Sequence, residues 1–296
     1  MDTIKQDHLI ERAAARLRSP MIRPESSPPG PIAGETPVLQ GLTSRARTRP
    51  QQSDLSARPP IALEKLAEAH LIDWGDAYSR AAEEFRIIKN RILRQIDEMN
   101  SAGARNLVMV TSARKGEGKS FTAINLAGEL ARHHDRRVLL VDADPKVSGL
   151  RQQLGVSDAS GLLDLVRSER PNLTDLILPT EVEFLDFLPL GTDAKGSGEL
   201  FASKGMTECM AELGRRNPDR LIIFDAPPCL ASSIPHTLAA CVGQIVLVVA
   251  ASSTHQSDIE AALELVQSCP QTSLLLNKIP SWSTHSFGSY GYVAAA

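Results

Sequence analysis

The segment TSARKGEGKS, residues 111–120, combines a glycine-rich turn with a lysine and a serine, which are residue types that bind phosphate groups. It follows an apolar run and precedes a helix-forming stretch, so backbone N–H groups and a helix N-terminus should face one anion. Gly116 and Gly118 allow close approach of the backbone, Lys119 would neutralise the β- and γ-phosphates, and Ser120 would bind magnesium. Ala113 stands where this motif usually has its first glycine. The predicted nucleotide contacts in this loop are Lys115, Gly116, Glu117, Gly118, Lys119, Ser120 and Phe121.

Two further apolar runs end in aspartate. Residues 138–145 have the sequence VLLVDADP, and residues 221–228 have LIIFDAPP. Ligands of parallel α/β sheets bind at the carboxyl ends of the strands, so Asp142 and Asp225 should lie beside the phosphate loop. Carboxylates there suit magnesium. We therefore expect Ser120, Asp142 and Asp225 to hold the metal, with Asp144 supporting the metal or the geometry.

The sequence gives a weaker indication of which nucleotide base is bound. The segment LNKIP, residues 276–280, has the Asn-Lys pair of a guanine-reading loop, but Pro280 occupies the position of its aspartate. This argues against GTP and favours ATP, with Asn277 as a candidate contact to the base.

These residues need a scaffold of alternating strands and helices. Apolar residues recur every three or four positions over 77–99, which predicts a long helix. The runs that follow are continuously apolar, as in strands covered by helices on both faces. We expect an α/β fold with a doubly wound, mainly parallel sheet of the P-loop NTPase type. The predicted strands are Asn106–Thr111, Arg137–Val141, Phe184–Leu188, Leu221–Phe224, Gln244–Val249 and Ser273–Leu276.

The N-terminal part has a different composition. Residues 1–18 contain a short amphipathic helix, a candidate docking element. Residues 19–75 are predicted to be a mostly disordered linker, because the stretch 19–60 is rich in Pro, Ser, Arg and Gly. We expect the catalytic domain over 76–283 and a mobile tail over 284–296 that carries Tyr290 and Tyr292.

Bulk properties narrow the function classes. The formal net charge of −3 does not predict a nucleic-acid partner. The four cysteines show no metal-ligand or CxxC spacing, which favours reduced residues in a cytoplasmic protein. No apolar run is long enough for a membrane span, so membrane contact should be indirect.

Several motifs together resemble those of the bacterial tyrosine kinases, relatives of the deviant-Walker partition and division ATPases. The similarity covers about residues 76–296 and includes both the phosphate loop and VLLVDADP. EEFRIIKNRI resembles the helix that packs subunits into a ring, which implies oligomer contacts by Glu83 and Arg86, with Lys89 in place of a usual arginine. Further similar segments are DADPKVSGLRQQLG, SGLLDLV, PLGTDAKGSGELFAS and the tail SYGYVAAA. The segment LIERAAARL is similar to a subgroup found in exosortase-linked polysaccharide loci.

The resemblance implies an ATP- and magnesium-dependent autokinase that forms a ring-like homo-oligomer. Lys119 would stabilise the transferred phosphate, Asp142 would accept or orient the tyrosine proton, and tail tyrosines would enter a neighbouring subunit's site. A membrane chain-length regulator, or polysaccharide co-polymerase, would dock on the N-terminal helix. Two alternatives share the same loop: an ATPase switch that positions a partner, and a scaffold that binds ATP without transferring phosphate. Arg114 aligns with the signature lysine of the partition ATPases, and this departure weakens the switch alternative.

Overall fold

The computed structural model describes residues 59–72, 80–99, 104–132, 136–146, 149–167, 171–192 and 194–279. These described residues belong to one compact unit. The predicted N-terminal helix, most of the predicted linker, and the tail with Tyr290 and Tyr292 lie outside the described residues.

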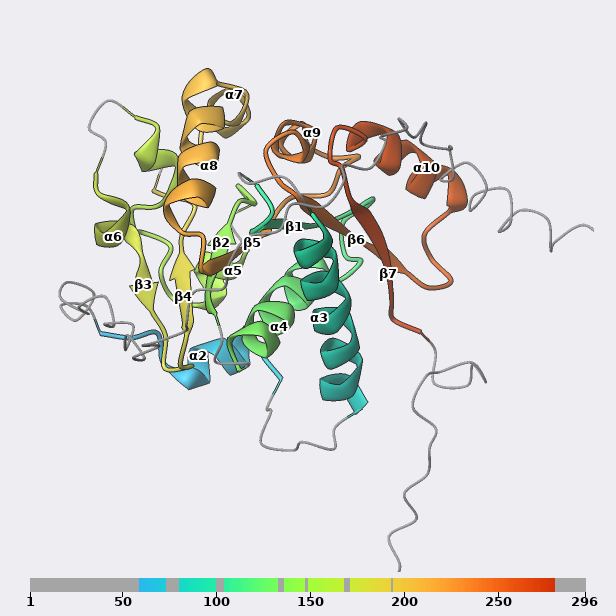
Figure 1. Ribbon diagram of the computed structural model, residues 1–296, viewed down its shortest axis with the longest axis horizontal. Helices are drawn as coiled ribbons and strands as arrows, with labels where there is room; N and C mark the ends of the chain where they lie inside the picture. Colours follow the sequence, from blue (N-terminus) through green and yellow to red (C-terminus); the bar gives the residue numbers. More distant parts are fainter. Residues whose placement is uncertain are drawn as a thin grey trace, which may run out of the picture. The chain divides into compact units, whose positions relative to one another are not determined.

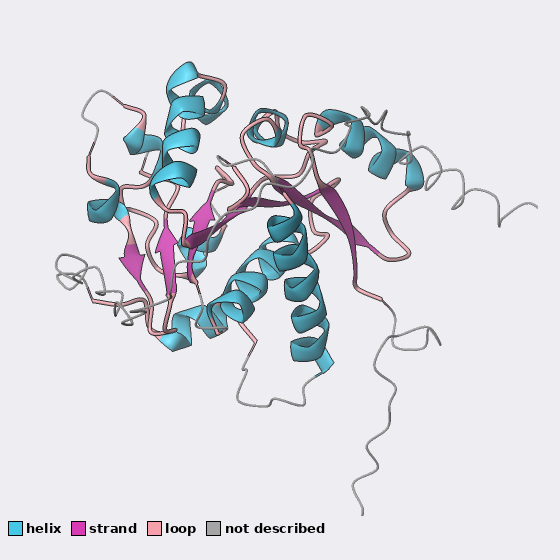
Figure 2. Cartoon of the chain, viewed as in Figure 1, coloured by secondary structure: helices cyan, strands magenta, loops and turns pink. Residues whose placement is uncertain are grey.

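A seven-stranded sheet forms the centre of this unit (Figures 1 and 2), with the strand order β3-β4-β2-β5-β1-β6-β7. All neighbouring strands are parallel except β3 and β4. The strands are β1 (Leu107–Ser112), β2 (Arg137–Asp142), β3 (Leu178–Pro179), β4 (Leu185–Leu188), β5 (Arg220–Asp225), β6 (Gln244–Ala250) and β7 (Thr272–Asn277). The six predicted strands and the fold class are confirmed. The two-residue β3 escaped prediction, because it is too short to show a period and contains a proline.

The α-helices are α2 (Leu63–Glu68), α3 (Arg80–Glu98), α4 (Lys119–Ala131), α5 (Leu150–Gln153), α6 (Leu173–Leu176), α7 (Ser197–Phe201), α8 (Lys204–Arg216), α9 (Ile234–Ala239) and α10 (Gln256–Leu265), with a 3-10 helix η2 (Leu162–Leu165). None of these described helices is both long enough and apolar enough to cross a bilayer.

Both faces of the sheet are covered, and successive residues of each central strand point to opposite faces. Leu107 and Met109 of β1 pack with helices α7, α8, α9 and α10 in one apolar cluster. Val108 and Val110 pack with α2, α3, α4 and α5 in the other. Figure 1 shows α3 and α4 together on one side of the sheet, with α8, α9 and α10 away from them. This two-sided burial explains why the central strands β1, β2, β5 and β6 are apolar along most of their length.

The structure corrects the extent of the predicted linker. Residues 59–72 were included in the predicted linker because of the composition of the residues before them. In the structure they are ordered and pack on the domain. Ile61 forms a bridge with Thr180 beside β3, and Leu66 of α2 is only 1% exposed. Burial of four apolar side chains in this segment, Ile61, Leu66, Ala69 and Leu71, stabilises its ordered conformation.

Candidate nucleotide-binding site

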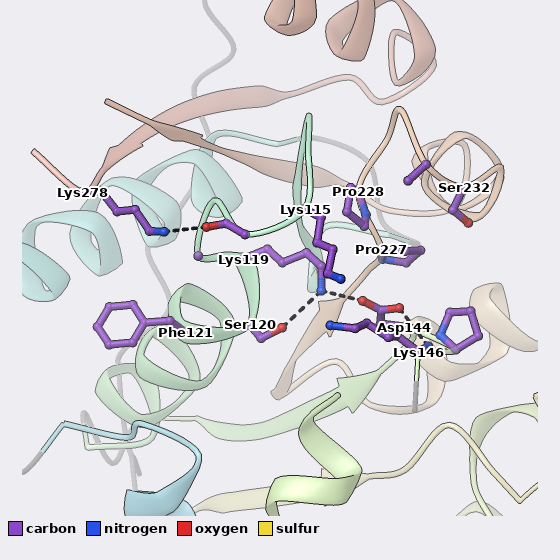
Figure 3. A pocket seen from close by; sticks show the side chains of 14 residues that line it. Lys115, Lys119, Ser120, Phe121, Asp144, Lys146, Pro227, Pro228, Ser232 and Lys278 are labelled. Atoms are coloured by element: carbon purple, nitrogen blue, oxygen red, sulfur yellow. Dashed lines mark hydrogen bonds and ion pairs between the residues drawn. The ribbon is translucent and has the colours of Figure 1, made fainter. Parts of the chain in front are cut away.

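A cavity of about 640 Å³ lies where β1 leads into α4, at the carboxyl ends of the central strands. Lys115, Gly116, Gly118, Lys119, Ser120 and Phe121 contribute to its wall, so most of the predicted loop residues are brought together. Asp144 also lines the cavity, and Figure 3 shows its carboxylate next to the end of the Lys119 side chain. The volume is in the range of small-ligand sites in proteins.

The loop adopts a conformation that its glycines permit. Gly116 and Gly118 have φ angles of 88° and 103°, in the region that favours glycine. A Cβ atom at Gly118 would also collide with the side-chain amide of Asn277. Gly118 is the N-cap of α4 and has no side chain with which to cap the helix. The N-terminus of α4 is therefore suited to bind an anion, as in phosphate-binding loops.

Lys119 is the central charge of the site. Its Nζ donates to Asp144 Oδ2 at 2.7 Å, contacts Asp225 Oδ1 at 3.5 Å, and lies 3.2 Å from Ser120 Oγ. Figure 3 shows the ammonium group between Ser120 and Asp144. Burial alone would lower the pKa of Lys119, but the charges of Asp225 and Asp144 outweigh it and raise this pKa. Lys119 therefore stays protonated and is positioned to bind phosphate oxygens.

Asp142 and Asp225 are adjacent in the register of β2 and β5, and both are fully buried. Burial raises the pKa of Asp142 to about 7, and the nearby charge of Asp225 adds to this effect. Burial also raises the pKa of Asp225, although Lys119 and Ser120 oppose the shift. The Oδ2 atom of each aspartate lacks a hydrogen-bond partner within the described part of the chain. Two buried carboxylates with free oxygens are arranged to accept a cation.

The residues fit magnesium better than a transition metal. Among the described residues, no three His, Cys, Asp or Glu side chains form a metal-ligand group. Magnesium is usually held by one or two carboxylates together with phosphate oxygens and water, whereas structural zinc takes four protein ligands. The two carboxylates of Asp142 and Asp225, with the Ser120 hydroxyl beside Asp225, match the ligand set usual for magnesium.

Several further contacts hold the loop in place. Glu117 is buried, and its carboxylate accepts from Arg114 N at 2.6 Å and from the Thr254 hydroxyl. Asn277 Nδ2 donates to Glu117 O at 2.9 Å, and Lys278 Nζ donates to Gly116 O at 2.6 Å. The structure thus gives Asn277 a role in fixing the loop, while its contact with the base stays a prediction.

The structure adds residues that the motif analysis missed. Lys146, Ser232 and Lys278 line the cavity, and Lys146 N donates to Asp144 Oδ1 at 3.1 Å. Lys146 follows Asp144 by two residues and Lys278 follows Asn277, so proximity to predicted residues was the available signal. Nothing in the local sequence identifies Ser232, which the fold brings from the segment before α9.

The predicted oligomer residues lie away from the cavity lining. Glu83 and Arg86 form an exposed ion pair on one face of α3. Lys89 of the same helix is buried instead, and its Nζ lies 2.6 Å from Glu129 Oε1 of α4. Lys89 therefore connects two helices within the domain, and only the exposed pair remains a candidate for subunit contact.

Comparison with known proteins agrees with this geometry. Residues 108–282 match the model of the CobQ/CobB/MinD/ParA nucleotide-binding domain. EpsB of Ralstonia solanacearum, named a putative tyrosine-protein kinase, is 34% identical over 169 residues, which are 57% of this chain and 22% of EpsB. The chain thus spans about a fifth of that relative's length.

Two further comparisons cover more of both chains. The tyrosine-protein kinase YwqD of Bacillus subtilis is 29% identical over 229 residues, which are 76% of this chain and 92% of YwqD. The kinase domain of the Escherichia coli tyrosine kinase ETK has the same fold, with a TM-score of 0.59 and 24% identity, over 72% of this chain and 80% of that domain. The chain therefore belongs to the CobQ/CobB/MinD/ParA nucleotide-binding family, and it is similar in sequence and in fold to the tyrosine kinases named above.

Proposed function

We propose that the chain is an ATP-dependent protein-tyrosine autokinase that phosphorylates Tyr290 and Tyr292 of a neighbouring copy. The observation that carries this proposal is the group formed by Lys119 of the phosphate loop and the buried aspartates Asp142, Asp144 and Asp225. The names of EpsB and YwqD as tyrosine kinases support it. ATP is preferred over GTP because Pro280 replaces the aspartate that would read guanine.

In the proposed reaction, the tyrosine oxygen forms a bond to the γ-phosphorus while the bond between this phosphorus and the β–γ bridging oxygen breaks. ADP leaves with the electron pair, and the tyrosine proton passes to a carboxylate. Asp142 is the candidate acceptor, because its Oδ2 atom has no hydrogen-bond partner among the described residues and burial in the metal-free site raises its pKa to about 7.

The remaining residues position charge. Lys119 neutralises the phosphate oxygens, and Asp144 orients Lys119 through their 2.7 Å contact. Ser120, Asp142 and Asp225 would hold magnesium, which supplies charge neutralisation of the transferring phosphate. The phosphoryl group passes through a loose transition state, so positioning and charge account for most of the catalysis.

The test uses the purified full chain with radiolabelled ATP and phosphotyrosine detection. Lys119→Met should reduce labelling about 100-fold or more, in line with loss of a charge that stabilises the transition state. Lys204→Met is the matched control, because the Lys204 side chain on α8 is 90% exposed and should have no effect. Equal labelling of Lys119→Met and wild type would exclude this mechanism.

A second pair of variants tests the acceptors. Changing Tyr290 and Tyr292 together to Phe should remove most phosphotyrosine while nucleotide binding is retained. Mixing this double variant with Lys119→Met chains distinguishes transfer between copies, since labelling of the Lys119→Met chain requires another copy's active site. Undiminished phosphotyrosine in the double Phe variant would show that the tail is not the acceptor.

The alternative of an ATPase switch predicts phosphate release without any phosphoprotein. In that class of ATPases a signature lysine stands at the position of Arg114, and the contacts of Arg114 do not support the switch. Its guanidinium forms a two-contact ion pair with Asp258, at 2.6 and 2.8 Å, and is not among the residues lining the cavity. If Arg114→Ala abolished ATP turnover, the switch would be favoured over the kinase.

We also propose that the chain acts in exopolysaccharide synthesis or export, recruited to the inner face of the cell membrane by a chain-length regulator. This part rests on the resemblance of the motifs and on the amphipathic pattern of residues 1–18. Deletion of residues 1–20 should abolish membrane recruitment in cells, and unchanged recruitment would refute the docking role.

A further inference from the structure

Residues 59–72 form a segment, here called the N-terminal strap, that is attached to the domain at both of its ends. At one end, Ile61 N donates to Pro179 O at 2.8 Å, and Glu181 N donates to Ile61 O at 3.0 Å. Glu181 Oε2 also accepts from Leu63 N at 2.7 Å, which caps the N-terminus of α2. The strap thus begins on the edge of the sheet beside β3.

The middle of the strap is anchored by apolar burial. Leu66 and Ala69 are 1% and 2% exposed, and they belong to the cluster that contains Leu150 and Leu154. These last two residues lie on or next to α5, the helix that follows the Asp142–Asp144 segment. The strap therefore packs against an element connected to the catalytic carboxylates.

The other end of the strap bonds to the side chain of Asn125 of α4, which is fully buried. Asn125 Oδ1 accepts from Ile72 N at 2.7 Å, and Nδ2 donates to His70 O at 2.9 Å. Nδ2 also donates to Phe121 O at 2.9 Å. His70 has a φ of 69°, an uncommon conformation for a residue with a side chain, which persists only where surrounding contacts enforce it.

The same amide therefore connects the strap with the first turn of α4. That turn contains Lys119 and Ser120, and Phe121 lines the cavity. A buried amide whose oxygen and nitrogen are both paired cannot shift without leaving a polar group unsatisfied, which is unfavourable. Movement of the first turn of α4 is thus coupled to release of residues 70–72.

We propose that Asn125 is a positioning residue through which the N-terminal strap holds the phosphate-loop helix, so that docking of the strap and binding of nucleotide strengthen each other. The coupling is reciprocal by thermodynamic linkage: a ligand that orders the first turn of α4 must also stabilise the strap. The strap joins residues 1–58 to the catalytic domain, so an event on that segment would reach the phosphate loop by this path. The inference requires nucleotide binding and does not require tyrosine phosphorylation.

Amide hydrogen exchange of the full chain tests the coupling, with and without Mg-ADP as the probe. Nucleotide should slow exchange in the phosphate loop and also, by about fivefold or more, at Leu71 and Ile72, whose N–H groups bond within the strap and to Asn125. Protection of the loop with unchanged exchange at residues 70–72 would overturn the proposal. Loop protection reports binding by itself, so loss of kinase activity would not be confused with loss of the coupling.

Two variants separate positioning from general stability. Asn125→Ala removes all three contacts, so it should weaken Mg-ADP binding about fivefold or more and abolish the response of the strap to nucleotide. Leu66→Ala loosens the strap by loss of apolar burial but leaves the amide bridge, so the response at residues 70–72 should persist. An equal response in Asn125→Ala and wild type would refute the role of this side chain. If Asn125→Ala did not fold, the wild-type measurement alone would decide.

Discussion

The ion pair between Lys89 and Glu129 is buried between α3 and α4, and we predict that breaking it by one substitution strongly destabilises the domain. The Lys89 Nζ and Glu129 Oε1 atoms are 2.6 Å apart, and the side chains are 8% and 5% exposed. The perturbation is the set Lys89→Met, Glu129→Met and the double variant. Methionine replaces the charge while roughly keeping the length and volume of each side chain.

The magnitude follows from the distance and the burial. At 2.6 Å and an effective dielectric constant of about 20, the gross Coulomb attraction is about 6 kcal/mol. The cost of removing both charges from water offsets most of this, so the intact pair contributes little net stability. One substitution leaves the other charge buried and unpaired, which should lower the free energy of unfolding by about 3–5 kcal/mol. The double variant should lie within about 1 kcal/mol of wild type.

Urea unfolding of the four proteins measures these differences as a double-mutant cycle. Glu84→Ala on the same helix is the matched control, because its pair with Arg80 is about half exposed and should change stability by at most about 0.5 kcal/mol. If each single variant lost less than about 1 kcal/mol, and the two losses added within about 0.5 kcal/mol, the buried pair would not connect the helices as inferred.

Two further predictions concern the site. Gly118→Ala should lower nucleotide affinity about tenfold or more, because the new Cβ atom would collide with Asn277 at a residue whose φ is 103°. Gly116→Ala should lower the affinity less, because there is open space where its Cβ atom would lie. Calorimetric titration with ATP measures both affinities, and equal losses would contradict the steric argument. The pKa of Asp142 is raised from 3.8 to about 7, so between these pH values the folded state binds a proton that the unfolded state releases. The stability that this group contributes is therefore fully present below pH 3.8 and is lost as the pH rises to about 7. Without divalent cation, wild type should lose about 1.4 kcal/mol per pH unit from this group in that window, Asp142→Asn should lack this component, and identical pH profiles from urea unfolding would refute it.

Much of the fold and of the site is encoded in short stretches of sequence. The order strand, glycine-rich loop and helix around Lys119, and the aspartates at the ends of β2 and β5, were predictable because each depends on residues within about one element. Continuous apolar runs predicted the central strands because burial on both faces requires it at every position. Because β2 and β5 are parallel neighbours, Asp142 and Asp225 lie side by side at the carboxyl ends of these strands.

Tertiary structure alone decided which distant residues meet. Lys89 reads as a surface residue of an amphipathic helix, yet it pairs with Glu129, 40 positions away. Asn125 lies in an apolar helix, and only the fold shows that it binds residues 70–72, more than 50 positions earlier. The two-residue β3 is a strand because it pairs with β4, and residues 59–72 are ordered because they pair and pack with the domain. Neither feature has a sequence pattern of its own that predicts it. Local periodicity and turn chemistry act within one element, whereas the partners of a buried polar group are set by how all elements pack together.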